Sequence, residues 1–300
     1  HGTFDIHLKT PQENTNVAFG VASALLNTPL LKKEEFVKIQ RQKIAEAHGN
    51  ACNVNAVANA LLFNHMYPAG HPMHKELLEG ADKRIAAVNY EDIVAFHKLL
   101  CNAPRVATVF SPSSAQKASA AVLAPLNCAS TLSFSAAAGS AEMPAAAVLS
   151  KVIPDKTSVS FMMGMPVDLH STHEDFLPLT MAINALAGGF GTRLMDETRD
   201  RLGLTYGVGG GLSGGVKRVA NSAAFVIQSS CKPSNLEKLQ NSIVNEVNKF
   251  IDAGIFDYEL EEQKDFAVGS RKVRNDTPAN ELALLHRNLL DGHDVSRLDS

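Results

Sequence analysis

The sequence predicts an α+β protein made of two repeated α/β sandwich domains, each an antiparallel-type sheet with helices packed on one face. At 300 residues the chain is about twice the length of a typical domain. The aromatic content is only 6% and Trp is absent, which favours helices packed on sheets over a β-sandwich. A strand, a helix, a break and a charged helix also occur twice in this order, about 220 residues apart, which indicates two copies of one fold.

The first copy opens the chain. Apolar and polar residues alternate where we expect strands, and apolar residues recur at helical spacing where we expect helices. His48-Gly49-Asn50 is a suitable helix stop, and Asn89 is a suitable N-cap with Asp92 in the first turn that follows. The expected elements are, in order, a strand over 4–8, helices over 11–26, 32–47, 57–66 and 92–100, and a short strand over 105–110.

The second copy has clearer signals for the starts of its helices. Ser171 with Glu174, and Ser234 with Glu237, have the spacing of capping boxes. The helix after Ser234 carries one apolar face, made of Leu236, Leu239, Ile243, Val247, Phe250 and Ile251. The expected elements are a strand over 158–167, a helix from 171 through 186, a glycine-rich turn over 188–191, a charged helix over 192–201, strands over 204–208 and 223–228, and helices over 234–251, 257–274 and 281–290.

The domain boundary is predicted where the composition changes. Residues 113–147 are rich in Ala, Ser and Pro and contain few large apolar side chains, as is typical of a linker or crossing segment. We therefore expect residues 1–112 to be the second part of a first domain, and residues 148–300 to be a second domain. Because the repeat begins partway through its first copy, both copies are expected to be incomplete, the second at its C-terminal end.

Composition excludes several classes of partner. The formal net charge is -3 and no Lys/Arg-rich block occurs, so we expect no nucleic-acid partner. Apolar stretches such as 57–63 are interrupted well before the roughly 20 residues that a bilayer requires, so we expect no membrane insertion. The four cysteines lie far apart without a C-x-x-C pair and are expected to be free thiols. No feature of the sequence indicates a cellular compartment.

Two histidine clusters and one glycine run are further candidate sites. His71 with His74, and His170 with His173, match neither the H-E-x-x-H nor the H-x-x-E-H spacing that places two ligands and a glutamate on one helical face. Structural or solvent-exposed roles are therefore the favoured interpretation, and no metal ligand is predicted. The glycine-rich turn over 188–191 lacks the Gly-Lys-Ser/Thr ending of a phosphate-binding loop, which favours a packing turn.

One long motif carries a family resemblance. LAGGFGTRLMDETRDRLGLTY, over residues 186–206, combines a glycine-rich turn, Arg-Leu, a charged helix and a Gly-Leu-Thr-Tyr closure. This motif resembles the signature of the second half of insulinase/pitrilysin-type zinc metallopeptidases, whose non-zinc domains are the so-called inactive, C-terminal type. Weaker landmarks over 27–36, 67–72 and 88–97 extend the resemblance to nearly the whole chain. It implies that both predicted domains are peptidase-like.

The resemblance also implies a site. In this family an Arg and a Tyr reach across a closed chamber to a peptide bound at the zinc of the opposite half. The matching residues are Arg199 and Tyr206, expected to support catalysis by contacting substrate carbonyl groups. A guanidinium and a phenol both donate hydrogen bonds to a carbonyl oxygen, on which negative charge develops during hydrolysis. Gly203 and Gly207 are expected to leave room for the substrate backbone.

A purely structural interpretation of this pair stays open. Strand alternation would place Tyr206 on the same face as Leu204 and Val208, where it would simply pack. Arg199 would then cap the end of its helix. The family register favours the functional interpretation.

The zinc itself is expected elsewhere. No H-x-x-E-H occurs, and the position of the third family ligand aligns with Ala47 instead of the neighbouring Glu46. The resemblance then implies a zinc-free, substrate-binding half of a metalloendopeptidase that hydrolyses peptides or unfolded polypeptides and is inactive in isolation. Zinc would come from a partner chain, as in a heterodimer, or from a preceding half of the same polypeptide. The alternatives are a non-catalytic structural subunit of a larger complex, a stand-alone peptide-binding module, and a complete single-chain protease with its zinc motif upstream.

Overall fold

The computed structural model confirms the α+β class with an antiparallel sheet, and it describes residues 4–103, 105, 107–111, 144–215, 219, 222–274 and 276–291. The chain forms two compact units, each assembled from separate stretches of sequence. The first unit draws on His1–His48, Gly80–Ser135 and Arg274–Ser300, and the second on Gly49–Glu79 and Ala136–Val273. Residues 49–79 therefore pack with the second unit. Most of the predicted linker, as far as residue 143, lies outside the described residues, so the domain boundary stays a prediction.

An antiparallel sheet of three strands forms the centre of the second unit in the described part of the chain. The strand order is β1-β3-β2, so β3 pairs with both neighbours. Val159 lies opposite Cys231 on one side of β3, and Ser213 lies opposite Ala224 on the other. The three predicted strands are confirmed, with bounds of β1 Val159–Val167, β2 Thr205–Ser213 and β3 Ala223–Cys231.

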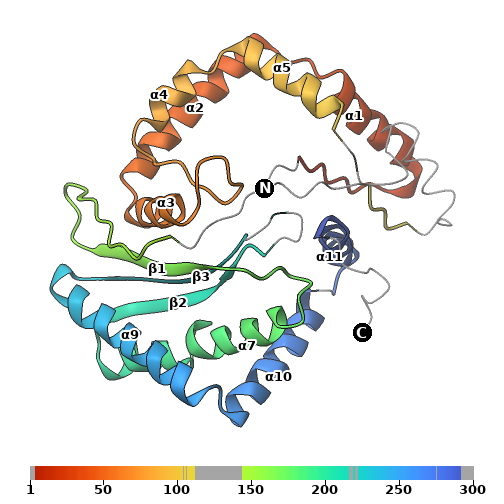
Figure 1. Cartoon of the computed structure of the whole chain (residues 1–300). Helices are drawn as coiled ribbons and strands as arrows, with labels where there is room; N and C mark the ends of the chain where they lie inside the picture. The colour runs from red at the N-terminus through yellow and green to blue at the C-terminus, as the bar shows by residue number, and fades with distance from the viewer. Residues whose placement is uncertain are drawn as a thin grey trace. The chain divides into compact units, whose positions relative to one another are not determined.

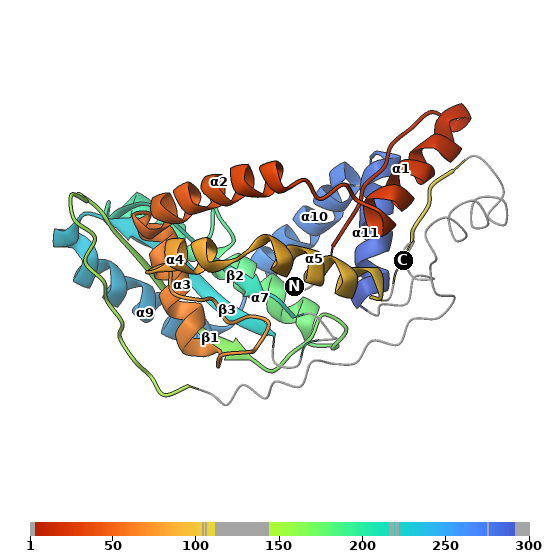
Figure 2. The ribbon, with the colours of Figure 1, turned by 90° about the horizontal axis from the view of Figure 1, so that it is seen from above.

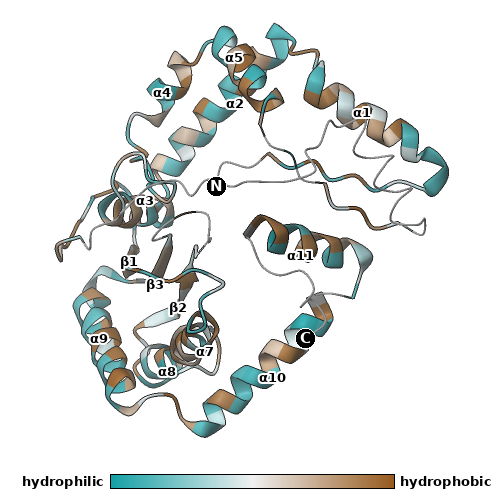
Figure 3. Ribbon diagram, turned by 45° about the vertical axis from the view of Figure 1, so that its right-hand side comes forward, coloured by the Kyte–Doolittle hydropathy of each residue, from teal (hydrophilic) through white to brown (hydrophobic). Residues whose placement is uncertain are grey.

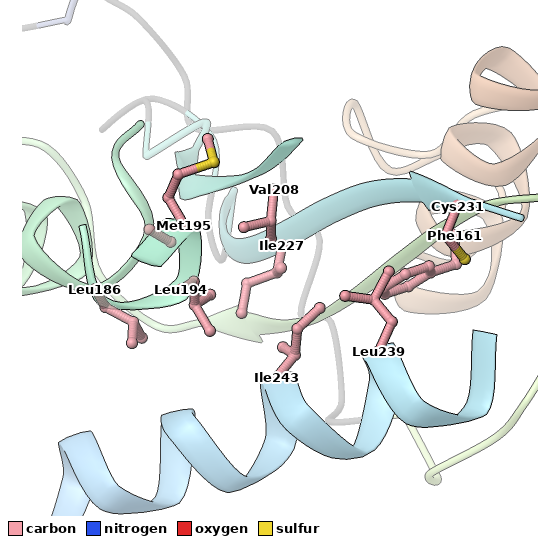
Figure 4. Packing of buried hydrophobic residues seen from close by; sticks show 10 residues of the cluster. Phe161, Leu186, Leu194, Met195, Val208, Ile227, Cys231, Leu239 and Ile243 are labelled. Atoms are coloured by element: carbon pink, nitrogen blue, oxygen red, sulfur yellow. The ribbon is translucent and has the colours of Figure 1, made fainter. Parts of the chain in front are cut away.

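One face of this sheet is covered by the helices α7 Phe176–Ala187, α8 Arg193–Met195 and α9 Leu236–Ala253 (Figure 1). Figure 3 shows both brown and teal residues along α9, as expected for a helix with one apolar side. Leu239 and Ile243 are fully buried and point from α9 towards the strands (Figure 4). They form one core with Phe161, Leu186, Ala187, Leu194, Met195, Val208, Ile227 and Cys231.

The opposite face of the sheet is covered as well, which the sequence did not predict. The helix α3, Val54–Met66, packs on β1, and Figure 1 shows it on the side away from α7 and α9. Tyr67, directly after α3, is fully buried, and its hydroxyl donates a hydrogen bond of 3.1 Å to the carbonyl oxygen of Ala223 in β3. This second core consists of Phe63, Met66, Tyr67, Met73, Ala224 and Val226.

Helices account for the regular structure described in the first unit. Figures 1 and 2 show α4 and α5 running along α2. Gln40 of α2 donates hydrogen bonds to the carbonyl oxygens of Ile85 and Val88, at 3.0 and 2.7 Å, and thereby ties α2 to the end of α4. The predicted cap at Asn89 is a complete capping box with Asp92. The elements are η1 Gln12–Asn14, α1 Thr15–Asn27, α2 Lys33–Ala51, α4 Ala81–Ala87, α5 Tyr90–Cys101 and α11 Pro278–Asp291.

The repeat seen in the sequence recurs in the order of helices. The first copy gives α1, α2 and α3, and the second gives α9, α10 Asp257–Arg274 and α11, whose first residues lie 221, 224 and 224 positions further along. The third helix of each copy belongs to the unit of the other copy, because α3 lies in the second unit and α11 in the first. An apolar helical face indicates that something covers it, but not which segment does so.

Several predicted elements are wrong. Residues 4–8 and 107–110 form no strand, and the described strands leave them without a pairing partner, on which strand formation depends. The predicted stop at 48–50 is overrun, since α2 continues to Ala51. Ile251 is exposed because it falls at the margin of the apolar stripe of α9. Neither Ser171 nor Ser234 caps a helix, because α7 begins later, at Phe176, and a 3-10 turn, η3 Pro233–Asn235, precedes α9.

Two expectations from the composition concern membrane-spanning helices and free cysteines. None of their helices combines the length and the apolar character that crossing a bilayer requires. Cys52, Cys101 and Cys231 are free thiols, as predicted, and Cys128 lies outside the described residues. Cys231 is buried in the core of the second unit, and this burial raises the pKa of its thiol.

Candidate functional site

The candidate site lies in the second unit, and its first part is the glycine-rich turn between α7 and α8. Gly189 and Gly191 have φ values of +137° and +72°, which side chains other than glycine rarely adopt. Phe190 stands between them, and 81% of its surface is exposed. The turn therefore directs an aromatic side chain away from the core.

The second part is a π-helical turn, η2 Asp196–Arg201, that continues α8. The amide of Leu202 donates to the carbonyl oxygen of Glu197 at 3.1 Å, a bond that spans five residues. Thr198 is fully buried and donates its hydroxyl hydrogen to the Leu194 carbonyl oxygen at 2.7 Å, which fixes the inner side of the turn. Widened helical turns of this kind are frequent at functional sites. Arg199 lies in its middle.

The third part is the start of β2, where the pairing with β3 is irregular. The register shifts between Thr205 and Val208, as in a β-bulge, and hydroxyl groups satisfy the displaced backbone. The Ser229 hydroxyl donates to the carbonyl oxygen of Gly207 at 2.8 Å, and the Gly207 amide donates to Thr205 Oγ1 at 3.0 Å. Tyr206 is thereby turned outward, with 86% of its surface exposed.

These three parts bring one guanidinium against two exposed aromatic rings. The guanidinium carbon of Arg199 lies 5.1 Å from the ring centre of Phe190 and 5.3 Å from that of Tyr206. Both distances are within the range of a cation–π contact. The two residues predicted as a pair, Arg199 and Tyr206, are thus in contact. Phe190, which was expected in a packing turn, joins them.

The charges around Arg199 are mixed. Its Nε lies 3.7 Å from a carboxylate oxygen of Asp200, and among the described residues the guanidinium makes no hydrogen bond. Two residues further on, Arg201 pairs with Glu197 through both carboxylate oxygens. The hydrogen bonds from Arg201 hold the pKa of the Glu197 carboxyl below its ordinary value, although burial opposes this. Glu197 is therefore engaged with Arg201, and Arg199 keeps its donors for another partner.

The purely structural interpretation does not describe this arrangement. Tyr206 is exposed while Val208 is buried, because the bulge breaks the alternation that would have placed them on one face. The side chain of Arg199 lies over the rings and caps no carbonyl group of its helix among the described residues. An aromatic residue between two glycines was the only signal in the sequence for Phe190.

The two predicted glycines have different surroundings. Gly203 has a φ of +61°, so its backbone conformation favours glycine although a Cβ would meet nothing within 4 Å. A Cβ on Gly207 would make an ordinary contact of 3.9 Å with Met195. Gly203 is therefore open on the side where a Cβ would point, whereas Gly207 faces Met195. The role of both glycines in admitting a substrate backbone stays a prediction.

A buried ion pair lies next to the site and connects it to α10. Arg193 Nε and one terminal nitrogen donate to the two carboxylate oxygens of Glu259, each at 2.6 Å, and the same terminal nitrogen reaches the Gly254 carbonyl oxygen at 2.9 Å. The guanidinium also lies over Phe250 and Phe256, with its carbon 4.6 and 4.3 Å from their ring centres. This contact connects α8, which leads into the π-helical turn, to the start of α10.

The described residues contain no group of three or more His, Cys, Asp or Glu side chains that could hold a metal ion. His71 accepts a bond from the Met73 amide, and His74 bonds to the Tyr67 carbonyl oxygen at 2.7 Å and to Asn64 at 3.2 Å. The ring centres of His170 and His173 lie 5.9 Å apart in an edge-to-face arrangement, and the hydroxyl of Thr172 lies 2.7 Å from His170 Nδ1.

The residue that aligns with the third family ligand is Ala47, which carries no carboxylate. Ala47 is buried, and its neighbour Glu46 is exposed and pairs with Lys43 at 2.7 Å.

This fold and this motif place the chain in a family of peptidase-like domains. Residues 87–266, which include the whole candidate site, match the model of the peptidase M16 inactive domain. The chain therefore belongs to the peptidase M16 inactive-domain family, and the resemblance to insulinase/pitrilysin-type enzymes is confirmed.

The chain is also similar to several individual proteins. The chain is 31% identical over 133 residues to the non-peptidase homolog YmxG of Helicobacter pylori, a match that covers 44% of this chain and 30% of that protein. The crystal structure of a peptidase M16 inactive domain from Pseudomonas fluorescens superposes with a TM-score of 0.74 at 22% identity, over 94% of this chain and 66% of that one. A chain of complex III from Candida albicans gives 0.67 at 11% identity, over 95% and 69%. The chain thus spans less than a third of its curated relative and about two thirds of these solved structures.

Proposed function

We propose that this chain is the substrate-binding, zinc-free half of a metalloendopeptidase, and that Arg199 and Tyr206 bind carbonyl groups of a peptide or unfolded polypeptide. The observation that carries the proposal is the position of Arg199. Its guanidinium is held against two exposed rings, yet it has no hydrogen bond among the described residues. A cation placed in this way retains N–H donors for a ligand.

The chemistry of the two side chains suits a peptide carbonyl. Aromatic rings contact a guanidinium through its face, so the N–H groups at its edge stay available for hydrogen bonds. The Tyr206 hydroxyl is a second donor, and its ring lies against the Arg199 guanidinium at the irregular start of β2. Donors that are already in place stabilise the negative charge that develops on a carbonyl oxygen without further rearrangement.

In this proposal the hydrolytic chemistry belongs to a zinc-bearing half, whether a separate subunit or another part of the same polypeptide. Zinc activates water and polarises a carbonyl group when bound. The residues of this chain would bind and orient the polypeptide.

The test is hydrolysis of a quenched fluorescent peptide by the assembled full-length protein, purified with whatever subunits accompany it. Arg199→Ala combined with Tyr206→Phe should lower kcat/KM by about 10² to 10³-fold, as expected for the loss of such donors. Arg201→Ala is the matched control, because Arg201 lies on the same turn but is engaged with Glu197. It should hydrolyse peptide at the wild-type rate.

A separate experiment tests whether the zinc belongs to another half of the protein. The isolated chain should contain no stoichiometric zinc by elemental analysis and should hydrolyse no peptide. Stoichiometric zinc together with turnover would overturn the proposal.

A second function is favoured by the relatives. YmxG is named a non-peptidase homolog, and the chain from Candida albicans is part of complex III2. This chain would then be a non-catalytic structural subunit. Unchanged peptide turnover after replacement of both Arg199 and Tyr206 in the assembled protein would favour that function.

A further inference from the structure

We propose that Phe190 is a third substrate-contacting residue, and that Phe190 and Tyr206 together bind a large apolar side chain beside the carbonyl group held by Arg199. This inference rests on the proposed function and adds a side-chain preference to it. The ligand class is a neutral, extended polypeptide segment with an aromatic or large aliphatic residue.

The first argument is that three separate segments bring their side chains together. Phe190 comes from the turn after α7, Arg199 from the π-helical turn and Tyr206 from the bulged start of β2. Each of these segments departs from regular geometry, with positive φ values at the turn, a widened helix and a shifted register. All three departures direct a side chain to the same place. Local irregularities of this kind are concentrated at functional sites.

The second argument is exposure. The rings of Phe190 and Tyr206 are 81% and 86% exposed, although both lie close to the same guanidinium. A structural cation–π contact of Arg193 in the same unit differs, because there the guanidinium is buried with Glu259 and its donors are used. The rings around Arg199 therefore have apolar surface left for a ligand, which the buried example does not.

The third argument is charge. Asp200 lies 3.7 Å from Arg199 Nε, and Asp196 and Glu197 belong to the same turn. These carboxylates offset the positive charge of Arg199 and Arg201, so the surface does not attract anions strongly. A neutral main-chain carbonyl suits Arg199 better than an acidic side chain does. We therefore expect the apolar position to discriminate against Asp and Glu.

The experiment measures the affinity of the assembled full-length protein for fluorescein-labelled peptides. All peptides share one Gly/Ser sequence and differ at a single central residue, which is Phe, Leu, Ala or Asp. The wild-type protein should bind the Phe and Leu peptides more tightly than the Ala peptide, and the Asp peptide most weakly. Phe190→Ala should weaken binding of the Phe and Leu peptides by about three- to ten-fold and leave the Ala peptide nearly unchanged. Phe190→Leu should retain most of the preference.

Leu177→Ala is the matched control, because Leu177 is an exposed apolar residue of α7 in the same unit. It should leave all four affinities unchanged. If Phe190→Ala lowers the affinity for every peptide equally, or for none, while Arg199→Ala weakens all of them, the inference about Phe190 is wrong and the proposed function stands. If Arg199→Ala also has no effect on any peptide, both are wrong.

Discussion

The guanidinium of Arg193 and the carboxylate of Glu259 form a buried ion pair with two hydrogen bonds of 2.6 Å, although 66 positions separate them in the chain. The amide of Phe256 donates a further bond of 2.8 Å to the same carboxylate. The pair therefore connects the first turn of α10 to α8, the helix that leads into the π-helical turn.

Removing the charge of Glu259 should destabilise the protein strongly. Glu259→Gln leaves a buried guanidinium without its counter-ion, which typically costs about 3–5 kcal/mol of unfolding free energy. Urea denaturation measures this change. Glu261→Gln is the control, because Glu261 pairs with Lys264 at the surface, where such a pair contributes about 0–1 kcal/mol. Equal losses in the two variants would mean that the buried pair has no special role.

The same carboxyl predicts a dependence of stability on acid. Burial raises the pKa of Glu259, but the hydrogen bonds from Arg193 and from the Phe256 amide outweigh it and hold the pKa below its ordinary value. A lowered folded-state pKa stabilises the protein above the unfolded-state pKa of about 4, and this contribution is lost as the pH falls through the folded-state value. Unfolding free energy should therefore fall more steeply below about pH 4 in wild type than in Glu259→Gln. Parallel pH curves would contradict the prediction.

Tyr67 should make the stability of the protein depend on alkaline pH. Tyr67→Phe loses the hydrogen bond to the Ala223 carbonyl oxygen, which should cost about 0.5–1.5 kcal/mol of unfolding free energy. Burial raises the pKa of Tyr67 to about 12. The stabilisation by the neutral phenol is thus complete below the unfolded-state pKa of about 10 and is lost as the pH rises towards 12.

Denaturation at a series of alkaline pH values measures the effect of Tyr67. Wild type should lose stability above about pH 10, and Tyr67→Phe should lose less. Tyr258→Phe, at an exposed position, should follow wild type. A wild-type curve that matches that of Tyr67→Phe would show that the phenol ionises equally in both states.

Gly164 should be essential to the pairing of β1 with β3. A Cβ at this position would lie 2.4 Å from the carbonyl oxygen of Phe225 and 3.3 Å from the Cα of Val226, so the strands would have to separate. We expect Gly164→Ala to cost about 2 kcal/mol or more, as other overpacked sites do. Gly209→Ala in β2, where a Cβ meets nothing within 4 Å, is the control. Amide exchange of β1 and denaturation measure both variants, and equal behaviour would contradict the prediction.

The sequence predicted the local elements better than their partners. Asn89 forms its capping box because both halves of the motif lie within one turn of helix. Ser234 has the same spacing to Glu237, but Pro233 begins a 3-10 turn, so Ser234 lies inside that turn and not at the cap. The alternation over 4–8 likewise describes a single strand and contains no information about a pairing partner. Nor does any local pattern indicate that α3 covers the second face of the sheet.

The site was predicted in part. The family register identified Arg199 and Tyr206, and the structure brings them into contact. Strand alternation alone would have buried Tyr206, because a β-bulge depends on the partner strand and leaves little trace in one sequence. Phe190 was missed for a related reason: the glycines that expose it are also the residues of an ordinary packing turn.

The most direct test of polypeptide binding at this site is site-specific photocrosslinking. The full-length assembled protein would carry p-benzoylphenylalanine in place of Tyr206 and, as a control, in place of Leu177, and would be irradiated with a fluorescein-labelled, unstructured Phe-containing peptide. We expect the probe at position 206 to crosslink to the peptide, excess unlabelled peptide to abolish the signal, and the probe at position 177 to give none. Absence of a crosslink at position 206, or equal crosslinking at both positions, would contradict the account.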